Sequence, residues 1–336
     1  MPAQFKPLSD QVIVVTGATS GHGLCTALMA AAKGAKVMLA ARDEQALAEV
    51  RDRIRAKGGT AEYVVADTGE EADVQRLAEE TARRFGGFDT WVNNAGIGVY
   101  AEVLDLSTED HRQVFETNYW GVVYGSVAAL RHLKERPRGG AIINVGSING
   151  DMGGPLLSSY NASKHAVKGF TDSLRIEAMK NKWPVSVTLI KPSAIGTPFP
   201  EYGRNETGFE PKLPPPIYAP ETVARAILAA AQRPHRSITV GFGGKFQVLG
   251  ATVLPWLFDQ VAARMAGTFI NYDEPVPDTP GNLYKPQGKD GRVEGEQKGR
   301  SFSLFTCAHL HPWATLGAVA AVAGGAWLAL REPARA

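Results

Sequence analysis

Two side chains that could move a proton, Tyr160 and Lys164, stand four positions apart in the segment SSYNASKHAV. If this segment is helical, both side chains lie on one face, about 5–6 Å apart at their Cβ atoms. An ammonium at that distance favours the phenolate, so we expect Lys164 to lower the pKa of Tyr160 and make it an acid or base usable near neutral pH. Because helices also bring such pairs together by chance, the pair alone does not identify a site.

A second segment suited to chemistry is TGATSGHG, residues 16–23. It follows a β-branched run at 12–16 and precedes a stretch that reads as a helix. Glycines at 17, 21 and 23 permit a tight turn and allow backbone N–H groups to approach a pyrophosphate at the helix N-terminus. A glycine-rich segment in this position predicts a dinucleotide-binding turn.

The elements that must position these segments alternate regularly along the chain. We expect strands at 12–16, 36–41, 61–66, 91–92, 141–147, 185–190 and 236–240, and helices at 18–33, 43–57, 70–85, 108–133, 158–180 and 219–232. Strands and helices that alternate at this spacing indicate βαβ units. The sequence therefore predicts an α/β fold, a Rossmann-type doubly wound parallel sheet of about seven strands with helices on both faces.

Five motifs in this order resemble the classical short-chain dehydrogenase/reductase family over residues 8–245. They are T-G-x-x-x-G-x-G at 16–23, VVADT at 64–68, NNAG at 93–96, Ser147 followed by Y-x-x-x-K at 160–164, and KPSAIGTPF at 191–199. The chain departs from the family at His22, where Ile or Leu is usual, and at Ser193, where Gly is usual.

The resemblance implies a catalytic set of four residues. Tyr160 would transfer a proton, and Lys164 would lower the pKa of that tyrosine and contact the nicotinamide ribose. Ser147 would bond the substrate oxygen, and Asn118 would hold a water beside the lysine. Cofactor contacts are expected from Gly17, Thr19, Ser20, Gly21, His22, Gly23, Arg42, Asp67, Thr68, Asn94, Ala95, Gly96, Tyr160, Lys164, Ile195 and Thr197.

The end of the second strand favours NADP(H) over NAD(H) as the cofactor. An acidic residue there would bond the adenosine ribose, but this chain has Ala41 followed by Arg42. A guanidinium can pair bidentately with a 2′-phosphate. The resulting hypothesis is an NADP(H)-dependent oxidoreductase that interconverts an alcohol and a carbonyl. Aromatic and aliphatic residues around 199–218 favour an apolar or lipid-like substrate.

Two other functions stay open at this point. One is a membrane-associated NADP-binding protein whose catalysis is incidental. The other is an epimerase or dehydratase built on the same fold. The resemblance leaves the oligomeric state open, including a homo-oligomer.

Three parts of the chain differ in composition. Residues 1–245 carry all five motifs and form the expected catalytic domain, with the Pro- and Gly-rich stretch 192–220 as its substrate lid. Residues 246–300 read as a helical extension followed by an extended or mobile linker rich in Pro, Gly and charge. Residues 301–336 form an apolar tail, in which 313–330 holds no charge and is long enough for a membrane helix. A helix packed on a partner or subunit is the alternative for this tail.

The composition limits the classes of partner. The 336 residues include 36 Lys or Arg and 34 Asp or Glu, a net charge of +2 without a basic stripe, which argues against nucleic acid and for a small-molecule substrate. Two cysteines and an N-terminus without a secretory pattern predict a cytoplasmic catalytic domain. Cys307, His309 and His311 alternate, a spacing that rarely converges on one ion, so no metal site is expected.

Overall fold

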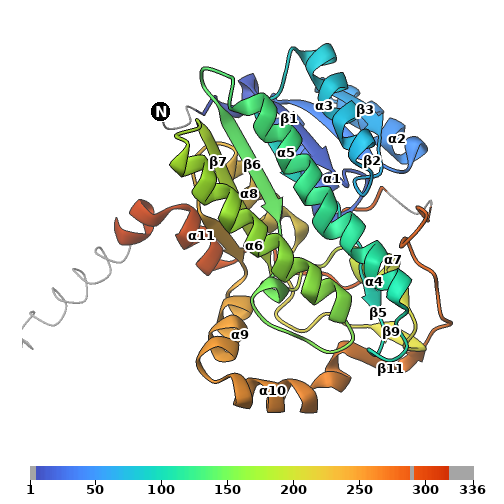
Figure 1. Cartoon of the computed structure of the whole chain (residues 1–336). Coiled ribbons are helices and arrows are strands. Elements are labelled where there is room, and N and C mark those ends of the chain that lie inside the picture. Colours follow the sequence, from blue (N-terminus) through green and yellow to red (C-terminus); the bar gives the residue numbers. More distant parts are fainter. Residues whose placement is uncertain (1–4, 288–290, 318–336) are drawn as a thin grey trace, which may run out of the picture.

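Seven parallel strands form one sheet at the centre of the protein (Figure 1). The structure is a computed structural model, and it describes residues 5–287 and 291–317. In spatial order the strands are β10 (Ser237–Val240), β7 (Val185–Pro192), β6 (Gly140–Val145), β4 (Thr90–Asn93), β1 (Val12–Thr16), β2 (Lys36–Ala41) and β3 (Thr60–Val65). This architecture confirms the predicted Rossmann-type fold.

Helices cover both faces of the sheet because successive side chains of each strand point to opposite faces. On β1, Ile13 and Val15 pack into one apolar cluster, whereas Val12 and Val14 pack into another. The first cluster includes residues of α1 (Gly21–Ala32), α2 (Glu44–Arg55) and α8 (Pro220–Ala230). The second includes residues of α3 (Glu71–Phe85), α5 (Gly121–Leu133) and α6 (Ser158–Lys180).

The order of the strands fixes where a ligand can bind. From β1 the chain builds outward through β2 and β3, and it then returns to the other side of β1 to add β4, β6, β7 and β10. The carboxyl ends of β1 and β4 therefore flank a topological switch point, where doubly wound sheets leave a crevice. Both the glycine-rich turn after β1 and the NNAG segment at the end of β4 lie at this point.

The helix expected at 108–133 is interrupted. The structure has α4 (Thr108–Phe115), a π-helical turn η2 (Glu116–Trp120) and then α5. A π turn inserts one residue into the helical repeat and is frequent at functional sites. Asn118 lies within this turn and is fully buried.

The lid and the extension after residue 245 are tied to each other by short strands. Within 192–220 the chain forms α7 (Phe199–Tyr202), β8 (Arg204–Asn205) and β9 (Phe209–Pro211). β8 pairs with β5 (Val99–Tyr100), and β9 pairs with β11 (Ile270–Pro275) of the extension. The remaining described elements are η1 (Leu8–Asp10), η3 (Ile148–Gly150), α9 (Phe242–Val253), α10 (Pro255–Arg264), η4 (Ala266–Phe269) and α11 (Leu304–Leu310).

The segment after β11 is bonded to the catalytic domain. Its backbone N–H groups donate to the catalytic domain at several places, from Asn282 to Tyr202 O (2.8 Å), from Gly291 to Thr19 O (2.8 Å) and from Gly295 to Gly196 O (3.0 Å). The sequence predicts an extended or mobile linker, and the structure has an extended segment whose polar groups find partners on the catalytic domain. We call residues 281–287 and 291–297 together the strap.

Within the part of the chain that the structure describes, no helix is both long and apolar enough to cross a bilayer. Of the membrane helix expected at 313–330, residues 318–330 lie outside the described ranges.

Packing of α5 on β4 gives a test of the fold. A Cβ atom at Gly125 would lie 2.0 Å from Asn93 Oδ1 and 2.7 Å from Trp91 Nε1. Gly125→Ala should therefore lower the free energy of unfolding by roughly 1–3 kcal/mol, although alanine is the better helix former. Denaturant titration measures this change.

The matched control is Gly169→Ala on α6, where an added Cβ meets no atom within 4 Å. The free energy of unfolding of that variant should rise by about 0.5–1 kcal/mol, because the only effect there is the greater helix preference of alanine. Equal gains in both variants would contradict the close packing of α5 on β4.

Candidate active site

The turn after β1 depends on its glycines for two physical reasons. Gly17 and Gly21 have φ angles of +63° and +54°, which side chains rarely tolerate. Gly23 faces inward, and a Cβ there would lie 2.1 Å from Gly17 O. Gly17 and Gly21 therefore shape the pocket wall, whereas Gly23 lets α1 begin directly against the turn.

Asn94 joins the end of β4 to this turn. Its Nδ2 donates to Thr16 O (2.8 Å) and Gly17 O (3.2 Å), and its backbone N–H donates to Thr16 Oγ1 (2.9 Å). Its Oδ1 lies 2.6 Å from His22 Nδ1. Because Nδ2 is used as the donor, Oδ1 must accept, so a neutral His22 carries its proton on Nδ1.

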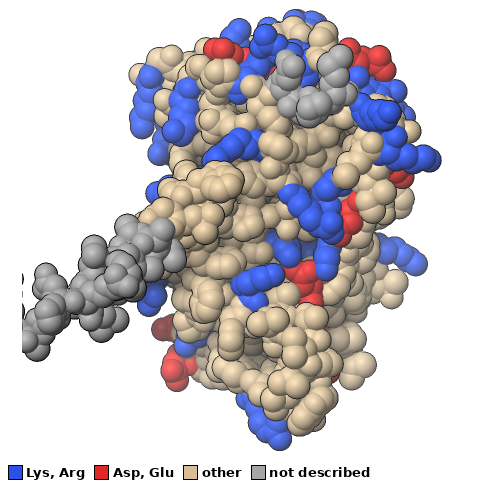
Figure 2. Space-filling model, turned by 90° about the vertical axis from the view of Figure 1, so that its left-hand side faces the viewer, with Lys and Arg blue, Asp and Glu red and all other residues tan. Residues whose placement is uncertain are grey.

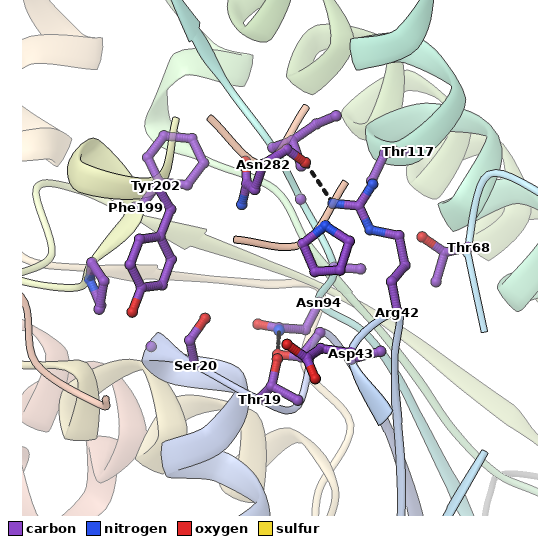
Figure 3. A pocket seen from close by; sticks show the side chains of 18 of the residues that line it. Thr19, Ser20, Arg42, Asp43, Thr68, Asn94, Thr117, Phe199, Tyr202 and Asn282 are labelled. Atoms are coloured by element: carbon purple, nitrogen blue, oxygen red, sulfur yellow. Dashed lines mark hydrogen bonds between the residues drawn. The ribbon is translucent and has the colours of Figure 1, made fainter. Parts of the chain in front are cut away.

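One pocket opens beside the turn. It encloses about 960 Å³, part of it open to solvent. We call it the glycine-turn pocket, and Figure 3 shows that Ser20, Arg42 and Asn94 border it from different elements. Its lining includes twelve of the expected cofactor residues, Gly17, Thr19, Ser20, Gly21, His22, Arg42, Asp67, Thr68, Asn94, Ala95, Gly96 and Thr197.

A dinucleotide fits the chemistry of this pocket. Backbone N–H groups and the N-terminus of α1 suit a pyrophosphate. Two lining residues also present buried oxygen atoms, Thr117 Oγ1 and Asn282 Oδ1, that have no hydrogen-bond partner among the described residues. Buried polar atoms are normally paired, so these two suit a polar ligand.

Arg42 reaches the pocket but already has protein partners. Its guanidinium donates to the backbone carbonyls of Asn282 (2.5 Å), Leu283 (3.4 Å) and Tyr284 (3.3 Å), all in the strap. Asp67 Oδ2 lies 3.9 Å from Arg42 Nη1. Figure 3 shows Arg42 and Asn282 pointing toward each other across the pocket.

A second, larger pocket holds the expected catalytic tyrosine. It encloses about 1610 Å³, part of it open to solvent, and we call it the Tyr160 pocket. Ser147, Lys164 and Ile195 also line it, as expected. Much of the rest is apolar, from Met152, Leu156, Leu157, Leu213, Phe258, Val261, Met265 and Phe269. The two pockets share the residues His22, Asn94, Gly96, Thr197 and Phe199, so they adjoin along one crevice.

Tyr160 and Lys164 are close, but burial governs both of them. Lys164 Nζ lies 5.5 Å from the centroid of the Tyr160 ring and donates to Val145 O (3.1 Å). Burial raises the pKa of Tyr160 to about 12, partly offset by a hydrogen bond with Ser147. Burial also lowers the pKa of Lys164 to about 8. We expected Lys164 to lower the pKa of Tyr160, and this prediction was wrong. Loss of hydration at the buried phenol outweighs any attraction from the Lys164 ammonium.

Asn118 lies behind the crevice. Its Oδ1 accepts from Ile97 N (2.9 Å), and its Nδ2 donates to Ile97 O (3.0 Å) and Ser163 Oγ (3.1 Å). A Cβ at Gly96 would lie 3.4 Å from Asn118 Oδ1 and 3.6 Å from Lys164 Nζ. Asn118 thus fixes the segment between β4 and β5 beside Lys164 while lining neither pocket.

Several lining residues were missed in the sequence. Phe199 and Tyr202 of α7 lie in the lid, where a run of aromatic residues was a usable signal. Asn282, Pro286 and Gln287 of the strap also line the glycine-turn pocket. No spacing rule links them to Arg42, which is 240 positions away from Asn282.

Comparison with known proteins agrees with this geometry. A family model described as short chain dehydrogenase matches residues 11–207. The chain belongs to the short-chain dehydrogenase/reductase family, and it is an oxidoreductase with an NAD(P)-binding Rossmann fold.

Three similar proteins illustrate the relationship. "Uncharacterized oxidoreductase YxnA" of Bacillus subtilis is 41% identical over 332 residues, 98% of this chain and 93% of that protein. "11-beta-hydroxysteroid dehydrogenase A" of Sesamum indicum is 34% identical over 247 residues, 70% of this chain and 69% of that protein. The crystal structure of a short-chain type dehydrogenase/reductase from Mycobacterium marinum has a TM-score of 0.62 and 27% identity, covering 70% of this chain and 96% of that one.

His22, the residue that departs from the family pattern, is held neutral. Burial lowers its pKa to about 4, the hydrogen bond with Asn94 opposes this shift, and the Lys164 ammonium adds to it. His22 therefore stays neutral in the folded protein at pH values near 6.5, where it binds a proton in the unfolded chain.

The lowered pKa of His22 predicts that the free energy of unfolding decreases in acid. The stabilising effect of a neutral His22 should be complete above pH 6.5, decrease as the pH falls, and be fully lost below pH 4. Between pH 7.5 and 5 the wild type should lose about 2 kcal/mol more than His22→Gln, as denaturant titrations at both values can measure. His165→Gln, at an exposed histidine of α6, should keep the wild-type slope. An unchanged slope in His22→Gln would contradict a neutral buried ring.

Proposed function

We propose that this oxidoreductase uses NADP(H) to interconvert an alcohol and a carbonyl on an apolar substrate. The observation that carries the proposal is the position of Tyr160 and Ser147 in an apolar pocket that shares a wall with the glycine-turn pocket. A ligand oxygen near these hydroxyls would lie next to any dinucleotide bound along the crevice.

The residues around that oxygen have distinct roles in the proposal. A bound nicotinamide would supply or accept the hydride. Tyr160, protonated at neutral pH because burial raises its pKa, donates its proton to the substrate oxygen during carbonyl reduction. Ser147 donates a hydrogen bond to the same oxygen as charge develops there. Lys164, with a pKa of about 8, is the buried group best suited to return a proton to the tyrosine.

The cofactor assignment follows the order of residues along the crevice. Gly17, Thr19, Ser20, Gly21 and His22 would hold the pyrophosphate at the start of α1. Arg42 would bind the 2′-phosphate, which favours NADP(H). At the adenine end the contacts would come from Asp67 and Thr68, and toward the nicotinamide from Asn94, Ala95, Gly96, Ile195 and Thr197.

Tyr160→Phe tests the acid/base role. This variant should lose roughly 100-fold or more in turnover, because proton transfer is removed, while its Kd for NADPH changes less than about twofold. NADPH oxidation with a panel of lipophilic ketones and aldehydes measures turnover, and fluorescence titration measures binding. Tyr100→Phe is the matched control. Tyr100 also lines the Tyr160 pocket but has no role in the proposed proton transfer, so this variant should keep its turnover.

Two outcomes of the same assays would contradict the proposal. Normal turnover in Tyr160→Phe would refute the tyrosine assignment. Turnover without net NADPH consumption would indicate an epimerase or dehydratase.

Arg42→Ala should raise the Kd for NADPH about tenfold or more without changing that for NADH, and an equal effect on both would refute the NADP(H) preference.

The surface near the Tyr160 pocket supports a lipid-like substrate. The side chains of Phe246, Leu249, Val253 and Trp256 on α9 and α10 are 66%, 55%, 63% and 69% exposed, and we call them the apolar face. Figure 2 shows that this lower part of the molecule is mostly uncharged and hollowed. Phe258 and Val261 of α10, and Met265 directly after it, line the pocket itself, so the apolar face continues into the pocket.

This face fits a bilayer surface better than water. Exposed apolar patches of this kind mark interaction sites, and helices with Trp and Phe on one face lie in membrane interfaces. The helices carry two cations, Lys245 and Arg264, and one anion, Asp259, which suits anionic headgroups. We propose that α9 and α10 rest on a lipid surface from which the substrate enters.

Vesicle flotation tests this part of the proposal. The full chain should float with vesicles that contain anionic phosphatidylglycerol, and Phe246→Ser/Trp256→Ser should reduce the floating fraction at least about fivefold. The control, Val103→Ser/Leu104→Ser, alters side chains that are 63% and 98% exposed elsewhere and should float like the wild type. Equal flotation of all three proteins would show that the apolar face does not bind the vesicles. A change of oligomeric state in Phe246→Ser/Trp256→Ser would instead show that the apolar face binds a second copy of the chain.

A further inference from the structure

The strap lies outside the part of the chain that defines the family, yet it borders the proposed cofactor site. The family model ends at residue 207, and the strap begins at 281. We propose that the strap is a wall of the dinucleotide site and that Asn282 contacts the adenosine half of the cofactor. This inference rests on the proposed function and adds a binding element to it.

One end of the strap is bonded to the glycine-rich turn. Gly21 N donates to Arg292 O (2.9 Å), and Gly291 N donates to Thr19 O (2.8 Å). The Arg292 guanidinium pairs with Glu201 Oε2 (2.6 Å) and lies 5.6 Å from the centroid of the Tyr202 ring. The strap therefore holds the same turn that would bind the pyrophosphate.

The other end is anchored in the core of the catalytic domain. Leu283 is completely buried in an apolar cluster with Ile97, Val99 and Val114. Tyr284 Oη donates to Asp110 Oδ1 (2.7 Å). Burial of a leucine side chain contributes roughly 1.5–3 kcal/mol, so this end is fixed by more than its backbone bonds.

The part of the strap around the Leu283 anchor faces the pocket. Asn282, Pro286 and Gln287 all line it. Asn282 Oδ1 is buried and has no partner among the described residues, while the backbone N–H of the same residue is bonded to Tyr202 O. The unpaired oxygen is an acceptor, and because protein atoms cover it, the side chain must turn toward the pocket before this oxygen can accept from a ligand donor such as the adenine amino group or a ribose hydroxyl.

The strap also orients Arg42 instead of removing it from the site. A guanidinium has five N–H groups, and the bonds to the carbonyls of Asn282, Leu283 and Tyr284 use at most three of them. The others stay available to a phosphate. Neutral carbonyls leave the positive charge of Arg42 in place, whereas a carboxylate in their position would neutralise it. The three carbonyls thus fix the guanidinium at the pocket edge without adding a negative charge to that of Asp67.

Hydrogen exchange with the full-length protein tests the inference. The probe is 2′,5′-ADP, which carries adenosine and a 2′-phosphate but no nicotinamide. At saturation it should slow amide exchange at least about fivefold in peptides that cover 281–287 and 291–297, together with those covering 17–23. NADP⁺ should give the same pattern.

The outcomes separate this inference from the proposed function. Protection at 17–23 with unchanged or faster exchange in the strap would overturn the inference, because the ligand would then bind without the strap or displace it. No protection in any of these peptides would overturn the dinucleotide site itself, and the inference with it.

A pair of variants then tests the side chain. Asn282→Ala keeps the carbonyl that binds Arg42 and should weaken NADPH binding about threefold to tenfold. Tyr284→Phe, which loses only the bond to Asp110, should bind NADPH within about twofold of the wild type. Wild-type affinity in Asn282→Ala, or an equal loss in both variants, would refute the contact.

Discussion

The bond between the Asn94 side chain and the glycine-rich turn is the constraint on which the crevice depends. Nδ2 of Asn94 ties the end of β4 to Thr16 and Gly17, and Oδ1 holds His22 at the start of α1. Asn94 and His22 belong to the wall that both pockets share. A shift of Asn94 would therefore move the turn relative to Tyr160. Close packing at Gly23, where no side chain fits, makes such a shift costly.

Much of this arrangement could be predicted from the sequence because it follows from periodicity and from glycine chemistry. The alternation of strands and helices predicted the parallel sheet, and the family resemblance singled out the glycine turn, Asn94, Ser147 and Tyr160, which line the two adjoining pockets. The protonation of Tyr160 was predicted in the wrong direction. The spacing of Tyr160 and Lys164 predicts their proximity, but the loss of hydration that sets both pKa values depends on what covers them.

The parts that sequence reasoning missed come from contacts between distant segments. The π turn that contains Asn118 looks like an ordinary helix in a pattern of apolar residues, because one inserted residue changes the repeat only locally. The segment after β11 has the composition of a linker. Its bonds to the catalytic domain leave no signal in the sequence, because most of them run through backbone groups. β11 nevertheless pairs with β9 of the lid, and α10 lines the pocket below it. Lid, extension and strap therefore all contribute residues to the lining of the crevice.

The distance along the chain between Arg42 and the strap has a consequence for how the protein is made. During synthesis the glycine turn and Arg42 leave the ribosome first, and Asn282 follows 240 residues later. Contacts of such long range form late, because the intervening chain must be ordered before they can close. A nascent chain that has folded its seven-stranded sheet thus still has a glycine-turn pocket without its strap residues. Termination of translation upstream of the strap would release a protein with a complete tyrosine–lysine pair and an unfinished nucleotide pocket.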